Sequence, residues 1–352
     1  DQNTTQFILC SKTIKKLETR VNADEAREWL LEYLPGASVA DVFAEISTNV
    51  PAMVEFVISP YSLFWIWDWV GVRFSVWSAV GLSAAIALGA DRFREFLSGA
   101  HAMDRHFREA GWRRNLPVLL GLIGIWQQNF IGADASVVLP YDQRLENLPD
   151  YLQQLYMESQ GKTATASGGM TVVPTGMAVW GAPGSHAQHS FAQWLHQGYA
   201  NVVVEYVGVV NGPAVQARQG RLFALANMVA QAEALAHGRG ADAVTEDLQS
   251  AGTDDETLAK LLPHKLHPGN RPSLILLLKE LSPRQLGALL ALYEHRVFVQ
   301  SVVWDINPFD QWGVELGKVR ANQFAGYLVD GDTASLPGVG EQILDWTNDA
   351  KL

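Results

Sequence analysis

Three shortages limit what this chain of 352 residues can be: cysteine, long apolar runs and positive charge. Its one cysteine, Cys10, excludes a disulfide framework within the chain and favours a reducing compartment, so we expect a cytoplasmic protein. The most apolar runs, at residues 76–90 and 116–126, are too short to span a bilayer, so we expect no membrane partner. The formal net charge of -11 argues against a nucleic-acid partner.

The N-terminal end lacks the features of a signal peptide. No segment there combines a basic stretch, an apolar stretch and a small-residue cleavage site. The chain begins with Asp1 rather than Met and enters an apolar, strand-like run at residues 7–10. We therefore expect a truncated chain or a fragment.

What the chain does have is an alternation of short apolar runs with amphipathic helical segments. Apolar residues make up 48% and charged residues 18% of the chain, which is typical of a globular protein with room for two domains. The alternation predicts an α/β fold. Strands are expected at residues 7–10, within 41–57, and at 135–139, 202–210 and 273–279. Helices are expected at residues 22–33, 83–100, 105–112, 116–132, 148–161 and 222–237, and a loop at 162–176.

The run from Asp305 to Lys318 gathers side chains that are costly to bury: carboxylates, carboxamides, an indole and an ammonium group. It follows an apolar run at residues 297–304. If that run is a strand of an open α/β sheet, it would deliver these groups to a ligand at its carboxyl end. The alternative is the capped start of a helix.

A second polar run, Ser11-Lys12-Thr13-Ile14-Lys15-Lys16, lies between an expected strand and an expected helix. Hydroxyl, ammonium and backbone N–H groups at such a turn suit a phosphate group. The alternative is a basic turn that is simply solvated.

Several stretches resemble motifs of the phosphoglucose isomerase (glucose-6-phosphate isomerase) family, from about Ser11 to Lys318. The resemblance implies two sugar-isomerase (SIS-type) α/β/α sandwich domains with parallel sheets. The first is incomplete, because nothing here resembles the family's N-terminal Gly-Ile-Gly-Gly-Ser loop. We expect residues 1–112 in the first domain, 113–318 in the second and 319–352 in a C-terminal arm. The motifs are residues 11–13, 67–75, 139–143, 180–189, 262–265, 269–272, 293–295 and 309–318.

The resemblance implies the aldose–ketose interconversion of glucose 6-phosphate and fructose 6-phosphate, a step of glycolysis and gluconeogenesis. A base removes the C2 proton, a cis-enediolate forms, and the proton returns at C1. The family needs no metal or redox cofactor and acts as a homodimer. By this resemblance Arg73 stabilises the enediolate, Gln311 and Lys318 orient the ring oxygens, and Glu18 lies near the sugar.

The phosphate group has its own residues in the family pattern. Ser11, Lys12 and Thr13 match the family's phosphate-binding Ser-Lys-Thr. Lys16 stands where the family usually has another threonine, and a lysine there can still serve phosphate as a point charge.

The chain departs from the family pattern at the chemical positions. Ala182 stands where the family has its catalytic glutamate, and loss of a positioned base costs roughly 10²–10⁴ in rate. Val72 replaces a glycine beside Arg73. The ring-opening histidine of the family, which the partner subunit contributes across the dimer interface, has no occupant in residues 209–217. His186 replaces an asparagine near the missing base and is a possible surrogate base.

The same stretch carries two smaller expectations. Ser185 and Gln188 predict a capping box at a helix start. His186, His189 and His196 have no spacing typical of a metal site, so we expect none.

Three functions remain open from the sequence. The chain is a glucose-6-phosphate isomerase by descent with low or absent activity, a non-catalytic sugar-phosphate binder, or a structural partner that dimerises.

Overall fold

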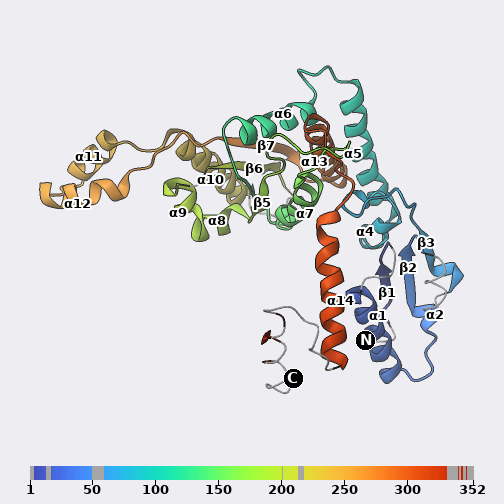
Figure 1. The fold of residues 1–352 in the computed structure, drawn as a ribbon. Helices are drawn as coiled ribbons and strands as arrows, with labels where there is room; N and C mark the ends of the chain where they lie inside the picture. The colour runs from blue at the N-terminus through green and yellow to red at the C-terminus, as the bar shows by residue number, and fades with distance from the viewer. Residues whose placement is uncertain are drawn as a thin grey trace. The chain divides into compact units, whose positions relative to one another are not determined.

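The computed structural model describes residues 4–12, 17–49, 59–199, 201–212 and 218–330, together with Gly340, Gln342, Ile343 and Trp346. Contacts divide the chain into two units, Asp1–Pro308 and Phe309–Leu352, and both sheets belong to the first unit (Figure 1). The domain boundary near residue 112 stays a prediction.

The strands form two parallel sheets, as the sequence predicted. The first has the order β1-β2-β3 and the second the order β5-β4-β6-β7. The strands are β1 (Phe7–Cys10), β2 (Phe43–Ser47), β3 (Leu63–Trp65), β4 (Ala135–Pro140), β5 (Ala178–Gly181), β6 (Val202–Asn211) and β7 (Ser273–Glu280).

Helices separate nearly all of these strands along the chain, which is why the strands can be parallel. None of the helices in the described residues is long and apolar enough to cross a membrane. The α-helices are α1 (Leu17–Tyr33), α2 (Val39–Val42), α4 (Leu82–Leu88), α5 (Ala90–Glu109), α6 (Leu116–Asn129), α7 (Leu148–Gln160), α8 (Gly184–Ser190), α9 (Ala192–Gln197), α10 (Arg218–His237), α11 (Ala241–Ser250), α12 (Asp255–Lys265), α13 (Pro283–Val303) and α14 (Glu315–Asp330). The 3₁₀-helices are η2 (Pro60–Ser62), η3 (Val72–Phe74), η4 (Ala79–Gly81), η5 (Gln143–Leu145) and η6 (Trp312–Val314).

The second sheet is the middle layer of an α/β/α sandwich (Figure 1). Its central strand β6 is apolar and β-branched along most of its length, and alternate residues serve opposite faces. Val207 and Val209 pack with α6, α7 and α13. Val204 and Tyr206 pack with α8, α9 and α10 on the other face.

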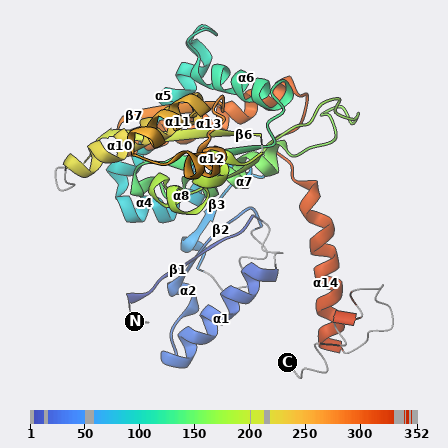
Figure 2. The same cartoon turned by 90° about the vertical axis from the view of Figure 1, so that its left-hand side faces the viewer.

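The first sheet has a smaller core between its strands and α1 (Figure 2). The Phe7 ring stacks on Phe43, with centroids 4.8 Å apart, and meets Trp29 of α1 edge-on. Leu30 and Phe43 are fully buried. Glu45 of β2 is also buried, and burial raises the pKa of its carboxyl to about 7.

The expected strand at residues 297–304 is wrong. These residues lie in or directly after α13, whose start is capped when Ser282 Oγ accepts from the N–H of Gln285 at 3.3 Å. A short apolar run fits a buried helix as well as a buried strand, and here the 21-residue helix decides. The sequence also missed β3, β5, α11 and α12, and it placed the helix break near residue 100 instead of at Gly89, whose φ of 82° favours glycine.

Two glycines allow α5 and α13 to pack closely along each other. A Cβ at Gly99 would lie 1.8 Å from the carbonyl oxygen of Arg284, and one at Gly287 would lie 2.0 Å from that of Phe96. Each helix therefore presents a glycine to the backbone of the other.

Replacing Gly99 with alanine should lower the stability of the fold, since the new methyl group has no space beside Arg284. Forced repacking of this kind costs about 1–3 kcal/mol. Urea unfolding measures the loss. Gly111→Ala is the control, because a Cβ there meets no heavy atom within 4 Å. Equal unfolding midpoints for the two variants would contradict the close packing of α5 on α13.

Candidate functional site

The expected phosphate turn begins where β1 ends. Ser11 is buried and donates its N–H to the Ile46 carbonyl at 3.0 Å. The Lys12 carbonyl accepts from the Thr48 N–H at 3.1 Å, so the turn is tied to the end of β2. Of the other predicted residues, Thr13 and Lys16 lie outside the described residues, as does the side chain of Glu18.

Lys12 links this turn to the segment that carries Arg73. Its Nζ donates to the carbonyl oxygens of Asp68 and Val70, the latter at 3.3 Å. Two motifs that lie 56 or more residues apart in the chain are therefore brought together.

Arg73 lies in η3 and is almost completely buried. Its Nε is 3.1 Å from Oε2 of Glu158, and its Nη1 donates to Ser159 Oγ and, at 2.8 Å, to the Pro308 carbonyl. Glu158 and Ser159 lie near the end of α7, and Pro308 follows α13. Arg73 thus joins its own segment to α7 and to the residues that follow α13. Val72, beside it, is half exposed.

A partly buried carboxyl, that of Glu294, holds the segment just after Arg73. Trp77 Nε1 donates to both oxygens of Glu294, at 2.8 and 3.0 Å, and the Tyr151 hydroxyl donates at 3.4 Å. Glu294 belongs to α13 and Tyr151 to α7. Burial raises the pKa of the Glu294 carboxyl to about 7, the donors from Trp77 and Tyr151 act in the opposite direction, and Asp104 adds a small upward shift.

The expected base position lies at the carboxyl end of β5. Ala182 is half buried in the turn between β5 and α8, and its methyl group can neither accept nor donate a proton. His186, the proposed surrogate base, is exposed on α8. Its N–H donates to the Pro183 carbonyl at 2.8 Å, so its backbone serves to start the helix.

The capping box predicted at this helix start is wrong. The N-cap residue is Pro183, and no side chain caps the helix. Gln188 instead accepts from the amide of Asn227 on α10, at 3.2 Å. A proline at the N-cap leaves the box without its hydroxyl partner.

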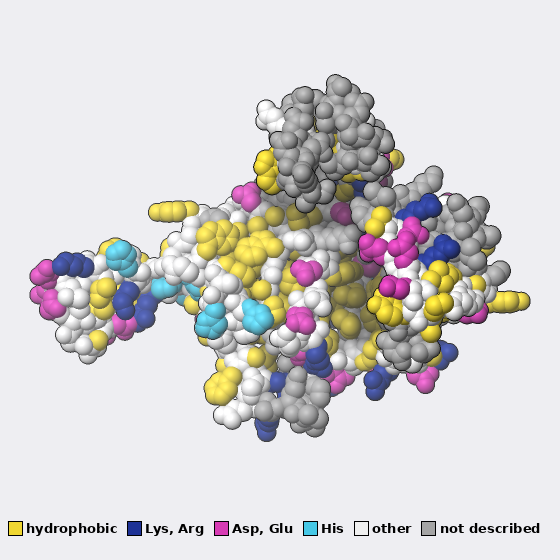
Figure 3. Space-filling model, turned by 90° about the horizontal axis from the view of Figure 1, so that it is seen from below, with side chains coloured by type: hydrophobic (Ala, Val, Ile, Leu, Met, Phe, Trp, Pro, Cys, Tyr) yellow, Lys and Arg dark blue, Asp and Glu magenta, His cyan; other side chains and the backbone are white. Residues whose placement is uncertain are grey.

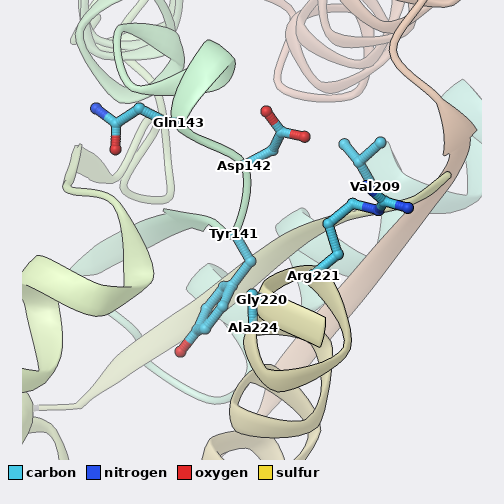
Figure 4. A pocket seen from close by; sticks show the side chains of 7 residues that line it. All are labelled: Tyr141, Asp142, Gln143, Val209, Gly220, Arg221 and Ala224. Atoms are coloured by element: carbon cyan, nitrogen blue, oxygen red, sulfur yellow. The ribbon is translucent and has the colours of Figure 1, made fainter. Parts of the chain in front are cut away.

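A crevice opens between the carboxyl ends of β4 and β6 (Figure 4). The chain runs from β4 to one side of the sheet and later from β6 to the other, so this is the point at which open α/β sheets bind ligands. The crevice has a volume of about 280 Å³. A neighbouring hollow of about 360 Å³ extends past Tyr141 to Pro183 and Ser185, close to Ala182. Residues lining the crevice are Tyr141, Asp142, Gln143, Val209, Gly220, Arg221 and Ala224.

Two arginines act on one carboxylate in this crevice. Arg144 donates to Asp142 from Nε at 2.8 Å and from Nη2 at 2.7 Å. These bonds hold the pKa of Asp142 below its usual value, and the charge of Arg221 lowers it further, although burial opposes them. Figure 4 shows the Arg221 side chain reaching toward Val209. Of these charged groups, Asp142 and Arg221 line the crevice, so the crevice offers a ligand one carboxylate and one guanidinium group.

Sequence reasoning missed Arg144 and Arg221. Arg144 could have been found from its place shortly after the carboxyl end of the buried strand β4. Arg221 gave no such signal, since it comes from a helix that starts far along the chain. None of the described residues form a group of three or more His, Cys, Asp or Glu side chains that could hold a metal ion.

Gln311 and Lys318 belong to the second unit, which is described by itself. Gln311 precedes η6 and accepts from the Val314 N–H through its carbonyl, at 3.2 Å. Lys318 lies one turn into α14, and both residues are exposed.

Comparison with known proteins identifies the family. The chain matches the phosphoglucose isomerase family over residues 1–336. It belongs to this family.

Relatives of known name agree with this assignment. A glucose-6-phosphate isomerase of Xanthobacter autotrophicus is 50% identical over 333 residues, which cover 94% of this chain and 60% of that protein. One of Chlorobium luteolum is 48% identical and covers 91% of this chain and 58% of that protein. The crystal structure of a glucose-6-phosphate isomerase from Chlamydia trachomatis superposes with a TM-score of 0.84 at 34% identity, over 99% of this chain and 63% of that one.

The chain therefore spans about 60% of the length of the curated relatives that it matches. The family and the SIS-type α/β/α fold expected from the sequence are confirmed. The roles assigned to individual site residues in this phosphoglucose isomerase family member stay predictions.

Replacing Glu294 with glutamine should flatten the pH dependence of stability. A carboxyl with a pKa of about 7 in the folded state and 4.5 as its reference stabilises the fold below pH 4.5, and this contribution is lost as the pH rises through 7. The shift corresponds to roughly 3 kcal/mol. Urea unfolding between pH 5 and 8 measures it, with Glu256→Gln on exposed α12 as the control. Parallel stability curves for the parent and Glu294→Gln would contradict a proton held at Glu294.

Proposed function

We propose that this chain binds a hexose phosphate of the glucose 6-phosphate and fructose 6-phosphate pair and that its isomerase activity is impaired. The observation that carries the proposal is Ala182 at the carboxyl end of β5, next to Pro183 and close to Ser185, which both line the hollow of about 360 Å³. The names of the relatives and the family membership support the substrate class.

In the proposed reaction a base would move a proton between C2 and C1 while a cation stabilises the enediolate oxygen. Ser11, Lys12 and Thr13 would hold the phosphate group. Gln311 and Lys318 would orient the ring oxygens. No described residue of the β5–α8 turn supplies a carboxylate for the proton transfer.

The placement of Arg73 supports a loss of activity as well. Its Nε and Nη1 already serve Glu158, Ser159 and the Pro308 carbonyl. A guanidinium beside a carboxylate attracts a developing anion less than one without such a neighbour. For full transition-state stabilisation Arg73 would have to exchange one of these partners for the substrate.

Restoring the glutamate should restore the reaction. We expect Ala182→Glu to convert fructose 6-phosphate about 10²–10⁴ times faster than the parent chain. A coupled assay measures the rate, with each chain also fused to the preceding segment of the Xanthobacter autotrophicus relative. Ala182→Gln is the matched control, because it has the same shape without a proton-accepting carboxylate.

Equal rates for the parent, Ala182→Gln and Ala182→Glu would contradict the assignment of Ala182 to the base position. Activity in the parent that disappears in His186→Asn would instead identify His186 as the surrogate base.

The second candidate is a non-catalytic sugar-phosphate binder, which the Lys12 turn and the Arg221 guanidinium in the crevice favour. Fructose 6-phosphate should then raise the melting temperature, since saturation at 100 times Kd stabilises a protein by about 2.7 kcal/mol. Lys12→Gln should weaken this shift, whereas Lys260→Gln on α12 should not. If no sugar phosphate changes the melting temperature, the remaining candidate function is that of a structural partner that dimerises.

We also propose, from the family resemblance, that the chain forms a cytoplasmic homodimer. Hydrophobic side chains gather on the face shown in Figure 3. Trp194, Leu222 and Phe223 of α9 and α10 are exposed large apolar residues, which supports burial against a second subunit. Light scattering after size exclusion tests the pairing.

A further inference from the structure

A further hollow lies at the amino ends of the strands of the second sheet, whereas the crevice lies at their carboxyl ends. Its walls are three segments that meet where β6 and β7 begin: residues 197–199, 237–241 and 263–271. Its volume is about 890 Å³. None of its lining residues belongs to the crevice at the carboxyl edge. Helices α11 and α12, which connect two of its walls, extend beyond the sandwich (Figure 1).

Hydrogen bonds between the walls fix the shape of this hollow. Arg239 and His267 exchange backbone bonds in both directions, at 2.8 and 3.0 Å. Gln197 Nε2 donates to the carbonyls of His264 at 3.0 Å and of Leu266 at 2.7 Å. A site whose walls are already ordered loses little conformational entropy when a ligand binds.

Two glycines show how closely the walls meet. A Cβ at Gly238 would lie 2.3 Å from the His267 carbonyl oxygen, and one at Gly269 would lie 2.6 Å from the N atom of Gly238. Both have positive φ, at 64° and 67°, a conformation that favours glycine. The glycines at these two positions therefore allow the walls of the hollow to pack closely.

The lining is basic, although the chain carries a net charge of -11. It includes two arginines and three histidines, and none of its residues is acidic. Two carboxylates act from outside the lining: Asp247 pairs with Arg239, and Glu233 lies 3.3 Å from His237. The basic lining residues are His237, Arg239, His264, His267 and Arg271.

The histidines do not point to a metal, since within the described ranges no cluster of metal-ligating side chains is present. Guanidinium and imidazole N–H groups suit phosphate oxygens instead, and arginine can bind them in pairs. Arg239 follows α10 and Arg271 precedes β7, so the two arginines come from different walls. An anion with more than one phosphate group can engage both.

We propose that this hollow is a second ligand site that takes a small compound with a diphosphate group. The site is separate from the crevice and does not depend on the isomerase proposal, because the two lie at opposite edges of the sheet and share no residue.

The test is calorimetric titration of the whole chain with inorganic pyrophosphate. Saturable binding to one site is expected, and Arg239→Gln should weaken it about tenfold by removing a charge-assisted contact. The matched control is Arg105→Gln on α5, since Arg105 pairs with Glu109 at similar exposure, 61% and 64%, compared with 50% and 52% for Arg239 and Asp247. His264→Ala, at an exposed lining position, should also weaken binding if Arg239→Gln fails to fold.

Further titrations separate the sources of the phosphate groups. Inorganic phosphate should bind more weakly than pyrophosphate, and saturating fructose 6-phosphate should leave pyrophosphate binding unchanged. Absence of saturable binding would overturn the proposal. So would an equal loss in Arg239→Gln and Arg105→Gln, which would indicate diffuse charge, or displacement of pyrophosphate by fructose 6-phosphate.

Discussion

The buried ion pair between Glu205 and Arg296 fixes the register on which the rest of the larger unit depends. Arg296 Nη1 donates to Glu205 at 2.6 Å in the centre of the sandwich, and both side chains are almost completely buried. Breaking such a pair leaves an uncompensated charge and typically costs about 3–5 kcal/mol. Helix α13 therefore has one favourable position against strand β6.

Once α13 is placed, its neighbouring residues connect three further elements. Tyr293 donates to the same Glu205 carboxylate. Glu294 accepts from Trp77 and Tyr151, and His295 lies 2.7 Å from Asp104 of α5. Four consecutive residues of one helix thus position the sheet, α7, α5 and the segment that holds Arg73. The scaffold around the candidate site follows from this one turn of helix, and it requires nothing of the residue at position 182.

Since the scaffold does not depend on the residue at position 182, the fold and the candidate site were predictable from the sequence to different extents. β6 was predictable because its side chains are apolar on both faces, as a central parallel strand requires. The run at residues 297–304 misled because a buried helix surrounded by apolar partners has the same composition as a buried strand. The turn after β1 and the segment around Arg73 stand out as local motifs whose roles stay predictions, whereas the contribution of Arg221 to the crevice could not be predicted. Its proximity to Asp142 arises from the order of strands in the sheet, which no local pattern records.

Lys12 and Arg73 differ in how much of their positive charge remains available to a ligand. Lys12 Nζ donates to two carbonyl oxygens, which are neutral, so its positive charge is retained at the turn after β1. Arg73 faces the carboxylate of Glu158 at 3.1 Å with both side chains shielded from much of the solvent, so most of its field is cancelled. In the proposed function, phosphate binding would depend on the first of these charges and enediolate stabilisation on the second. With these proposed roles, the neutral partners of Lys12, the carboxylate beside Arg73 and the methyl group of Ala182 favour binding of a sugar phosphate over its conversion.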